Sequence, residues 1–303
     1  MDNNLTLEDF QPVKRKKLMV EKSYYRSTFS TIIHVLKENK LAMACVFILG
    51  IIFFASVFAF LSPYDPDIVN VGERLQGISS KHILGTDDLG RDLFTRALYG
   101  GRVSLLVGFS SMIVSVIIGT CVGTISGYMG GTVDIILMRI VDILLSVPSL
   151  LLIIVFYSFV SPNIVTLVIM LSMFSWTNVA RIVRAETLSI KERDYVIAAK
   201  SLGVSDFVII IRHIIPNLAS QIIVAASLSI ANAILDESAL SFLGYGVQLP
   251  KSSWGSMLQT AQKYILYDPL LAIVPGILIL FTVLCFNILG DMLQHALDPK
   301  LNK

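Results

Sequence analysis

Two adjacent carboxylates, Asp236 and Glu237, are the side chains in this chain best placed to act as acid and base or to bind a cation. They directly follow an apolar run, so they also fit the outer end of a membrane helix, exposed to water. Ser126 is a further candidate, within the sequence Gly123-Thr124-Ile125-Ser126-Gly127. This segment is one residue too long for the GxSG pattern of intramembrane serine proteases, and a glycine face on a helix explains it better.

A second acidic group lies in Leu84-Gly85-Thr86-Asp87-Asp88-Leu89-Gly90-Arg91-Asp92. Calcium loops place their ligands at alternate positions and end in Glu, which this segment does not do. Thr86, Asp87 and Asp92 are residue types that cap turns and helices. We therefore expect capping and predict neither a metal site nor a catalytic site in this chain.

Several motifs are absent from the sequence. It contains no GxxxxGK[ST], so we expect no ATP binding through a Walker motif, and it contains no HExxH zinc motif. The histidines are scattered, and the cysteines lie inside apolar runs, where they fit as small buried residues. These residues are His34, His82, His213 and His295, and Cys45, Cys121 and Cys285.

The composition is that of a protein that crosses a membrane several times. Of 303 residues, 54% are hydrophobic and 15% are charged, whereas a soluble domain has about 25% charged residues. The net charge of +2 gives no reason to expect a nucleic-acid partner. Apolar runs of about 20 residues predict membrane spans. We place six, at 41–61, 103–127, 143–161, 163–181, 218–236 and 270–290.

The first span starts too late and ends too unlike a cleavage site for a signal peptide, so we interpret it as an uncleaved anchor. With a cytoplasmic N-terminus, 17 Lys and Arg residues lie inside and 7 outside. The positive-inside rule favours this orientation, with both termini in the cytoplasm of a cell-membrane protein. The basic cluster Lys14–Lys17 fits as a topology signal. The predicted parts are a cytoplasmic basic tail (1–40), a first span (41–61), an extracytoplasmic loop (62–102), a transmembrane domain (103–291) and a cytoplasmic C-terminal tail (292–303).

Local patterns suggest how some spans pack. Gly119, Gly123 and Gly127 are four residues apart, which predicts a helix face that another helix can approach closely. This face could slide or be static. Pro148 is expected to kink the third span, and Arg139 is expected to pair with Asp142.

A cytoplasmic hairpin is predicted between spans four and five. Ser189 and Glu192 have the spacing of a capping box, so a helix is expected to begin there. Gly203 can take the left-handed conformation that ends a helix. Ser205 and Asp206 are expected to cap a second helix. That helix would carry an apolar stripe of Phe207, Ile210, Ile211 and Ile214, and Pro216 would close it.

This hairpin resembles the "EAA" loop of ABC-importer permeases. The resemblance rests on Ala198-Ala199, then Gly203, then Pro216. Two positions depart from the pattern, because Ile197 stands where Glu is usual and His213 where Ile is usual. A surface hairpin without a partner is the alternative.

Other segments are similar to the peptide and nickel branch of these permeases. They are "LGTDDLGRD" followed by "YGGRVSL", and "SALSFLGYGVQLP" followed by "SWG". The resemblance covers nearly everything from Asn39 to Leu301. It implies an all-α fold of the type I ABC importer permease, with a cytoplasmic coupling helix between spans four and five. It also implies a second related permease subunit, two ATPase subunits that bind ATP and Mg²⁺, and an extracytoplasmic binding protein.

The resemblance also assigns roles to residues. Ala198, Ala199 and Leu202 would fill a groove on the ATPase, Gly203 would set the turn, and Glu192 would cap the helix or meet a basic residue. Asp87, Asp88, Arg91, Gly244 and Trp254 would face the binding protein, with Trp254 as an anchor at the membrane interface.

Polar residues within spans could line a translocation path or bond to other helices. These are Ser175, Asn178, Asn232 and Asn287. The predicted cargo is a peptide. A nickel or metal-chelate cargo is the alternative within the class, and a passive channel and a membrane-embedded hydrolase are the alternatives outside it.

Overall fold

The computed structural model describes residues 39–297, and over that range the chain folds almost entirely into helices. Five of these helices are long and apolar enough to cross a membrane, and a sixth span forms if one bent helix pair is counted as one. The predicted all-α, six-span architecture is thereby confirmed. The cluster Lys14–Lys17 and the last part of the C-terminal tail lie outside the described residues. The spanning helices are α2 (Lys40–Val57), α3 (Leu93–Met129), the pair α4 (Gly131–Leu145) and α5 (Ser149–Tyr157), α6 (Ile164–Lys191), α9 (Ala219–Phe242) and α11 (Leu270–Leu297).

The bent pair is the predicted third span. It bends by 80° between α4 and α5. Pro148 is the N-cap of α5. Its ring disfavours helical backbone at the preceding residue, so the predicted kink becomes a complete break. α4 also begins at Gly131, well before the predicted start of the span at 143.

α3 is longer than predicted and starts at Leu93 rather than near 103. The reason is local: the Asp92 carboxylate accepts a hydrogen bond from Thr95 N at 2.8 Å and caps the helix ten residues before the apolar run. At the start of α6, Asn163 plays the same part, accepting from Thr166 N at 2.8 Å.

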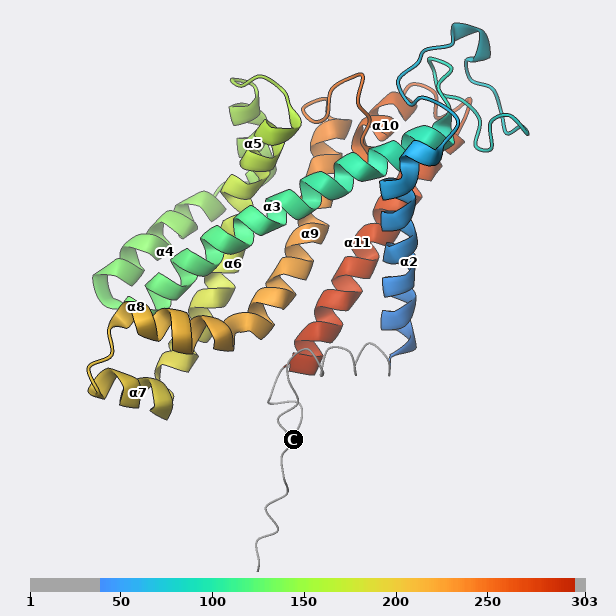
Figure 1. Cartoon of the computed structure of the whole chain (residues 1–303). Helices are drawn as coiled ribbons and strands as arrows, with labels where there is room; N and C mark the ends of the chain where they lie inside the picture. The colour runs from blue at the N-terminus through green and yellow to red at the C-terminus, as the bar shows by residue number, and fades with distance from the viewer. Residues whose placement is uncertain (1–38, 298–303) are drawn as a thin grey trace, which may run out of the picture.

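α3 crosses the bundle obliquely and contacts most of the other spans (Figure 1). It packs along α6 and α9, while α2 packs against α11 and α3. The short helices α7 (Asp194–Ser201) and α8 (Asp206–Ile209) lie at one end of the bundle, together with the start of α2 and the end of α11. The 62–92 loop and α10 (Trp254–Ala261) lie at the other end.

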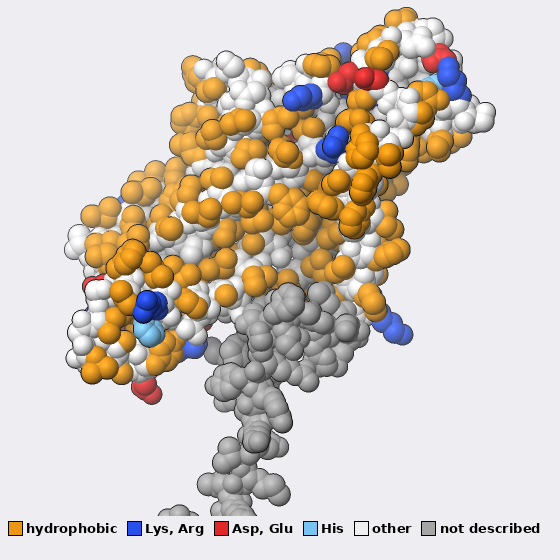
Figure 2. All heavy atoms as spheres, in the orientation of Figure 1, with side chains coloured by type: hydrophobic (Ala, Val, Ile, Leu, Met, Phe, Trp, Pro, Cys, Tyr) orange, Lys and Arg blue, Asp and Glu red, His pale blue; other side chains and the backbone are white. Residues whose placement is uncertain are grey.

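Apolar side chains cover the middle of the visible face, and charged side chains gather toward the two ends (Figure 2). Many large apolar side chains of the long helices are exposed, among them Phe47, Phe54 and Ile117. Such a band matches the hydrocarbon core of a bilayer between two polar ends.

The predicted glycine face of α3 is in close contact with α6. A Cβ added at Gly119 would lie 2.6 Å from Val179 Cβ, and one added at Gly123 would lie 2.5 Å from the Ala180 carbonyl oxygen. Gly127 is as tightly packed, against Thr187. Only the absence of a side chain lets the two helices approach this closely.

We predict that Gly123→Ala lowers the thermal stability of the protein. Overpacking costs about 1–3 kcal/mol, which exceeds the gain of about 0.5–1 kcal/mol when Ala replaces Gly in a helix. The control is Gly50→Ala in α2, because a Cβ there meets nothing within 4 Å. Thermal unfolding in detergent, followed by tryptophan fluorescence, measures both variants. A midpoint for Gly123→Ala equal to that of the control would contradict the close contact.

Candidate functional site

The hairpin between spans four and five begins later than predicted. α6 continues to Lys191, so Ser189 lies inside it and the predicted capping box is wrong. Glu192 is the C-cap residue of α6, and α7 starts after Arg193. The physical reason is burial: Ile190 is completely buried, and the last turn of α6 is what buries it.

The glycine turn is confirmed. Gly203 has φ +78°. Its N–H donates to the Lys200 carbonyl at 3.0 Å, and Val204 N donates to the Ala199 carbonyl at 3.2 Å. This pair of bonds closes the end of α7 in a Schellman arrangement. An added Cβ at Gly203 would meet nothing within 4 Å, so only the positive φ requires glycine.

α7 has an inner and an outer face. Val196 and Ala199 are buried against the chain's own core, beside Ile209 and Ile214. The three residues predicted to fill an ATPase groove therefore divide: Ala199 packs inward, whereas Ala198 and Leu202 point outward, with Leu202 84% exposed. We call the outward-facing set the hairpin patch: Ile197, Ala198, Leu202, Phe207 and Ile211.

The second helix of the hairpin does not end at Pro216, so that prediction is wrong. Helical structure continues from Asp206 to Phe242 as one candidate span. α8 passes into a π-helical segment (η4, Ile210–Ile214), then a 3₁₀ turn (η5, Ile215–Leu218), then α9. The π and 3₁₀ turns change the hydrogen-bond register around Pro216, which cannot donate. The hairpin is thus joined to span five by continuous helical structure.

Ion pairs tie α4 to α6 near the hairpin. Arg184 binds Asp134 through two bonds, Nε to Oδ1 at 2.5 Å and Nη2 to Oδ2 at 2.6 Å. The Ser126 hydroxyl also donates to Asp134. Asp142 pairs with Arg181 at 2.6 Å. The predicted pairing with Arg139 is wrong, because a basic side chain on the packed neighbour α6 reaches the carboxylate.

The 62–92 loop is held by an internal network. Asp87 Oδ2 lies 2.7 Å from Arg91 Nε and 3.2 Å from Arg96 Nε. Asp87 Oδ1 accepts from Leu89 N and Arg91 N, so the predicted capping by Asp87, like that by Asp92, is confirmed. Asp87 and Arg91 are both buried, inside the loop and not on its surface. Burial, and then the neighbouring Asp87 carboxylate, raise the pKa of the half-buried Asp88.

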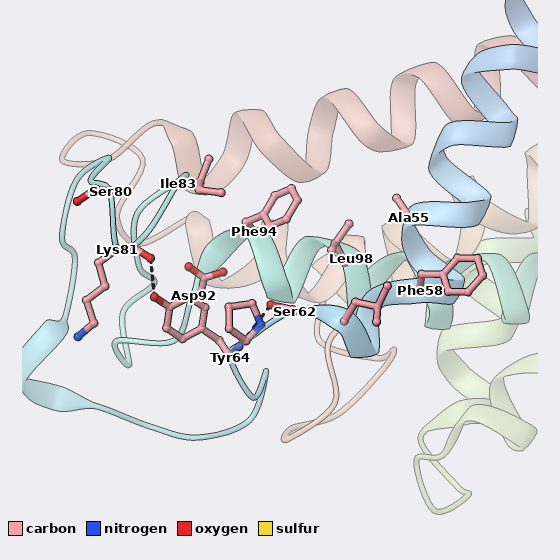
Figure 3. Close-up of a pocket in the computed structure, with 12 residues that line it drawn as sticks. Ala55, Phe58, Ser62, Tyr64, Ser80, Lys81, Ile83, Asp92, Phe94 and Leu98 are labelled. Atoms are coloured by element: carbon pink, nitrogen blue, oxygen red, sulfur yellow. Dashed lines mark hydrogen bonds between the residues drawn. The ribbon is translucent and has the colours of Figure 1, made fainter.

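A cavity of about 440 Å³ separates the end of α2 from the start of α3. Figure 3 shows its apolar wall, with Phe58, Phe94 and Leu98, and its polar wall, with Tyr64 and Asp92. The Tyr64 hydroxyl donates to the Lys81 carbonyl at 2.6 Å. Nearby, the hydrogen bond between Lys81 and Glu73 raises the pKa of the lysine and lowers that of the glutamate. These polar groups are engaged in holding the loop.

Trp254 was predicted to be an anchor at the membrane interface. This prediction is wrong, because Trp254 is a core residue. Its side chain is fully buried, and its Nε1–H donates to the Ala97 carbonyl at 2.9 Å. α3 leaves room for the ring at Gly101, where an added Cβ would lie 3.0 Å from Trp254 Cζ2. Gly244, half-buried with φ +90°, forms the turn after α9.

Glu237 was expected to be in water and is fully buried, so that expectation is wrong. It accepts hydrogen bonds from Ser241 and Ser104, whereas its neighbour Asp236 is half-buried. The sequence did carry one signal for this buried site, because Ser238 and Ser241 closely follow the carboxylate of Glu237. Ser104, which completes the site, is far away in sequence and could not be assigned to it.

The residues proposed for a translocation path are not gathered in one cavity of the described chain. The Ser175 hydroxyl donates to the Leu171 carbonyl at 2.8 Å, within α6. Asn178 and Asn232 are exposed. Asn287 lines an apolar groove of about 360 Å³ between α9, α10 and α11. Within residues 39–297, no cluster of His, Cys, Asp or Glu could hold a metal ion.

Two family models match this chain. One describes the binding-protein-dependent transport system inner membrane component and covers residues 119–303, from the glycine face of α3 through the hairpin to the C-terminus. The chain belongs to this family. The other describes the N-terminal transmembrane domain of oligopeptide transport permease C and covers residues 27–77 of the permease.

Curated relatives cover most of the permease. The dipeptide transport system permease DppC of Bacillus subtilis is 42% identical over 88% of this chain and 84% of its own. The oligopeptide transport system permease OppC of Escherichia coli is 39% identical over 98% of this chain and 97% of its own. Among solved structures, the inward-facing MetNI methionine ABC transporter matches with a TM-score of 0.57, covering 67% of this chain and 96% of the other at 18% identity. This likeness confirms the predicted fold.

The permease is therefore a multi-pass membrane component of an ABC transporter, working with other transporter subunits, and it is not an enzyme. Family membership removes the hydrolase hypothesis for Asp236, Glu237 and Ser126. Instead, Ser126 and Glu237 form hydrogen bonds that hold helices together.

We predict that the Asp134–Arg184 pair stabilises the fold more than the Asp142–Arg181 pair. The first is bidentate and mostly shielded from water, while both side chains of the second are about half exposed, at 49% and 53%. A double-mutant cycle to alanine should give a coupling energy of about 1–3 kcal/mol for the first pair and about 0.2–1 kcal/mol for the second. Unfolding in detergent measures both coupling energies. Equal values would contradict a larger stabilising effect of the Asp134–Arg184 pair.

Proposed function

We propose that the permease is a subunit of an ATP-driven importer that carries short peptides across the cell membrane into the cytoplasm. Curated relatives 39–42% identical to it are named as dipeptide or oligopeptide transport permeases, which favours peptides over nickel or a metal chelate. A second related permease, two ATPase subunits that bind ATP and Mg²⁺, and an extracytoplasmic binding protein complete the proposed assembly.

The hairpin patch is the observation that carries the proposal. Leu202 and Phe207 are 84% and 72% exposed, in the hairpin at one end of the bundle. Contiguous exposed apolar side chains outside the membrane indicate a surface that another protein covers. In our proposal, that partner is the ATPase subunit. Glu192 and Lys200 lie beside the patch, where they can pair with charged side chains of the ATPase.

Coupling follows from the rigid connection of the hairpin. Because helical structure is continuous from Asp206 to Phe242, a pull on α8 displaces α9 as well. Ala199 and Val196 lock α7 to the same core, so the hairpin moves as one body with the cytoplasmic end of α6 and α9.

The proposed orientation puts the hairpin and both termini in the cytoplasm. It is supported by the excess of Lys and Arg on that side, and by the start of α2 and the end of α11, which lie at the same end of the bundle as the hairpin (Figure 1). The 62–92 loop and the turn at Gly244 then face the binding protein. Asp88 lies near the loop surface, while Asp87, Arg91 and Trp254 support it from within.

The exposed amides of Asn178 and Asn232 are proposed to line the path or face the second permease, because an amide is costly in lipid. Ser175 and Asn287 are proposed as further path residues.

Replacing Gly203 by Pro is expected to abolish uptake without preventing membrane insertion. Proline fixes φ near −65°, while Gly203 has φ +78°, and it removes the N–H that bonds Lys200. Peptide uptake and membrane content of the variant are the two measurements. Uptake at the wild-type rate would contradict the coupling role of this turn.

Replacing Leu202 by Asp is expected to prevent capture of the ATPase subunits. A charge at this position would be buried without a partner at the proposed interface. The matched control is Leu266→Asp, an equally exposed leucine (91%) at the opposite end of the molecule. Affinity purification in mild detergent, with mass spectrometry of what accompanies the permease, reads out both variants.

For the wild-type chain, this purification should recover a second six-span chain and ATPases with Walker motifs. A binding protein in the same sample gives the substrate class. Recovery of the permease alone, stable in several detergents, would overturn the proposed assembly.

A further inference from the structure

A carboxylate is buried beneath the loop that joins α9 to α10. Glu237 is fully buried near the end of α9. Its Oε1 accepts from the Ser241 hydroxyl at 2.6 Å, and its Oε2 accepts from the Ser104 hydroxyl of α3 at 3.0 Å. Ser238 adds a longer contact, at 3.5 Å. Within the described part of the chain, the hydrogen bonds that the Glu237 carboxylate accepts thus all come from serines, which we call the serine cluster.

The carboxylate sets the direction of the hydrogen bonds around it. A serine hydroxyl has one hydrogen to donate, and its oxygen can accept others. Because Ser241 donates to Glu237, its oxygen is free to accept from Val247 N at 3.1 Å and from the Ser253 hydroxyl at 3.3 Å. Ser104 likewise donates to Glu237 and accepts from Trp254 N, the first residue of α10, at 3.2 Å.

The loop and α10 also lie in direct contact with these serines. A Cβ added at Gly246 would lie 1.9 Å from Ser241 Oγ, and one added at Gly255 would lie 2.6 Å from Ser238 Cα. Ser253 caps α10 through a capping box with Ser256. Both ends of the loop are therefore attached to the network that Glu237 organises.

We propose that Glu237 is a positioning residue that holds the 243–253 loop in one conformation for contact with the protein that delivers substrate. The role in delivery rests on the proposed function, whereas the hold on the loop rests on the hydrogen bonds alone. The loop exposes three large side chains to the surroundings, which are Leu243, Tyr245 and Leu249.

An amide cannot replace this carboxylate. In Glu237→Gln, the NH₂ group would donate to Ser104 or Ser241, each of which already accepts a backbone N–H. The hydrogen of that serine would then have no acceptor in a buried site, which is costly. Asp236→Asn is the matched control, because it makes the same change one residue away, at a half-buried side chain outside the serine cluster.

The experiment uses the complete transporter in lipid nanodiscs. For the mobility measurement alone, Leu249→Cys carries a spin label in a background where the exposed Cys121 is replaced by Ser, while Cys45 and Cys285 are buried. The ATPase measurement keeps Leu249. We expect Glu237→Gln to increase the mobility of the label. We also expect the stimulation of ATPase activity by the binding protein to fall by about fivefold or more, the equivalent of one lost buried hydrogen bond. Asp236→Asn should leave both measurements unchanged.

Label mobility at the wild-type level in Glu237→Gln would overturn the proposal whatever the ATPase does. A mobile loop with normal stimulation would overturn its role in delivery. If no binding protein stimulates the wild-type transporter, the proposed function fails, and label mobility still decides whether Glu237 holds the loop. If Glu237→Gln does not assemble, Ser241→Ala applies the same test, because it keeps the carboxylate and removes one donor together with the acceptor of Val247 N.

Discussion

The close contact between α3 and α6 is the constraint on which the other elements depend. Lipid tails are as apolar as the side chains, so helices in a bilayer associate through tight packing and polar contacts instead. Gly119 and Gly123 permit that packing on one face of α3. At the hairpin end of the same contact, Asp134 and Arg184 join α4 to α6. Because α6 is fixed along its length, its last turn sets where the hairpin begins.

A second constraint acts on every polar group inside the bundle, which must find a partner within the protein. Ser175 and Thr187 meet it locally, by donating to carbonyls one turn earlier in the same helix. Glu237 meets it by accepting from Ser241 on its own helix and from Ser104 on α3. Around Pro216, which has no N–H to donate, the helical register changes through a π segment and a 3₁₀ turn. In each case the polar group also fixes how neighbouring segments sit.

Features governed by neighbours in sequence could be predicted. The apolar runs located the spans, Gly203 located the turn, and Asp92 was recognised as a cap. Errors arose where a distant contact outweighed a local rule. Ser189 has the spacing of a cap, but burial of Ile190 extends α6 past it. Trp254 has the chemistry of an interface anchor, but glycines on α3 provide a pocket for it. The ring and its pocket are about 150 residues apart in the sequence, so no local pattern could join them.

The same argument explains why the two ends of the permease could not be connected from sequence alone. Pro216 was expected to separate the hairpin from span five, yet helical structure runs unbroken from Asp206 to Phe242. One end of this helical segment carries Phe207 of the hairpin patch, and Glu237 of the serine cluster lies near the other. Helical structure therefore connects the hairpin to the loop at the other end of the bundle. In the proposed transporter, this segment is the direct mechanical link between the ATPase and the side on which substrate arrives.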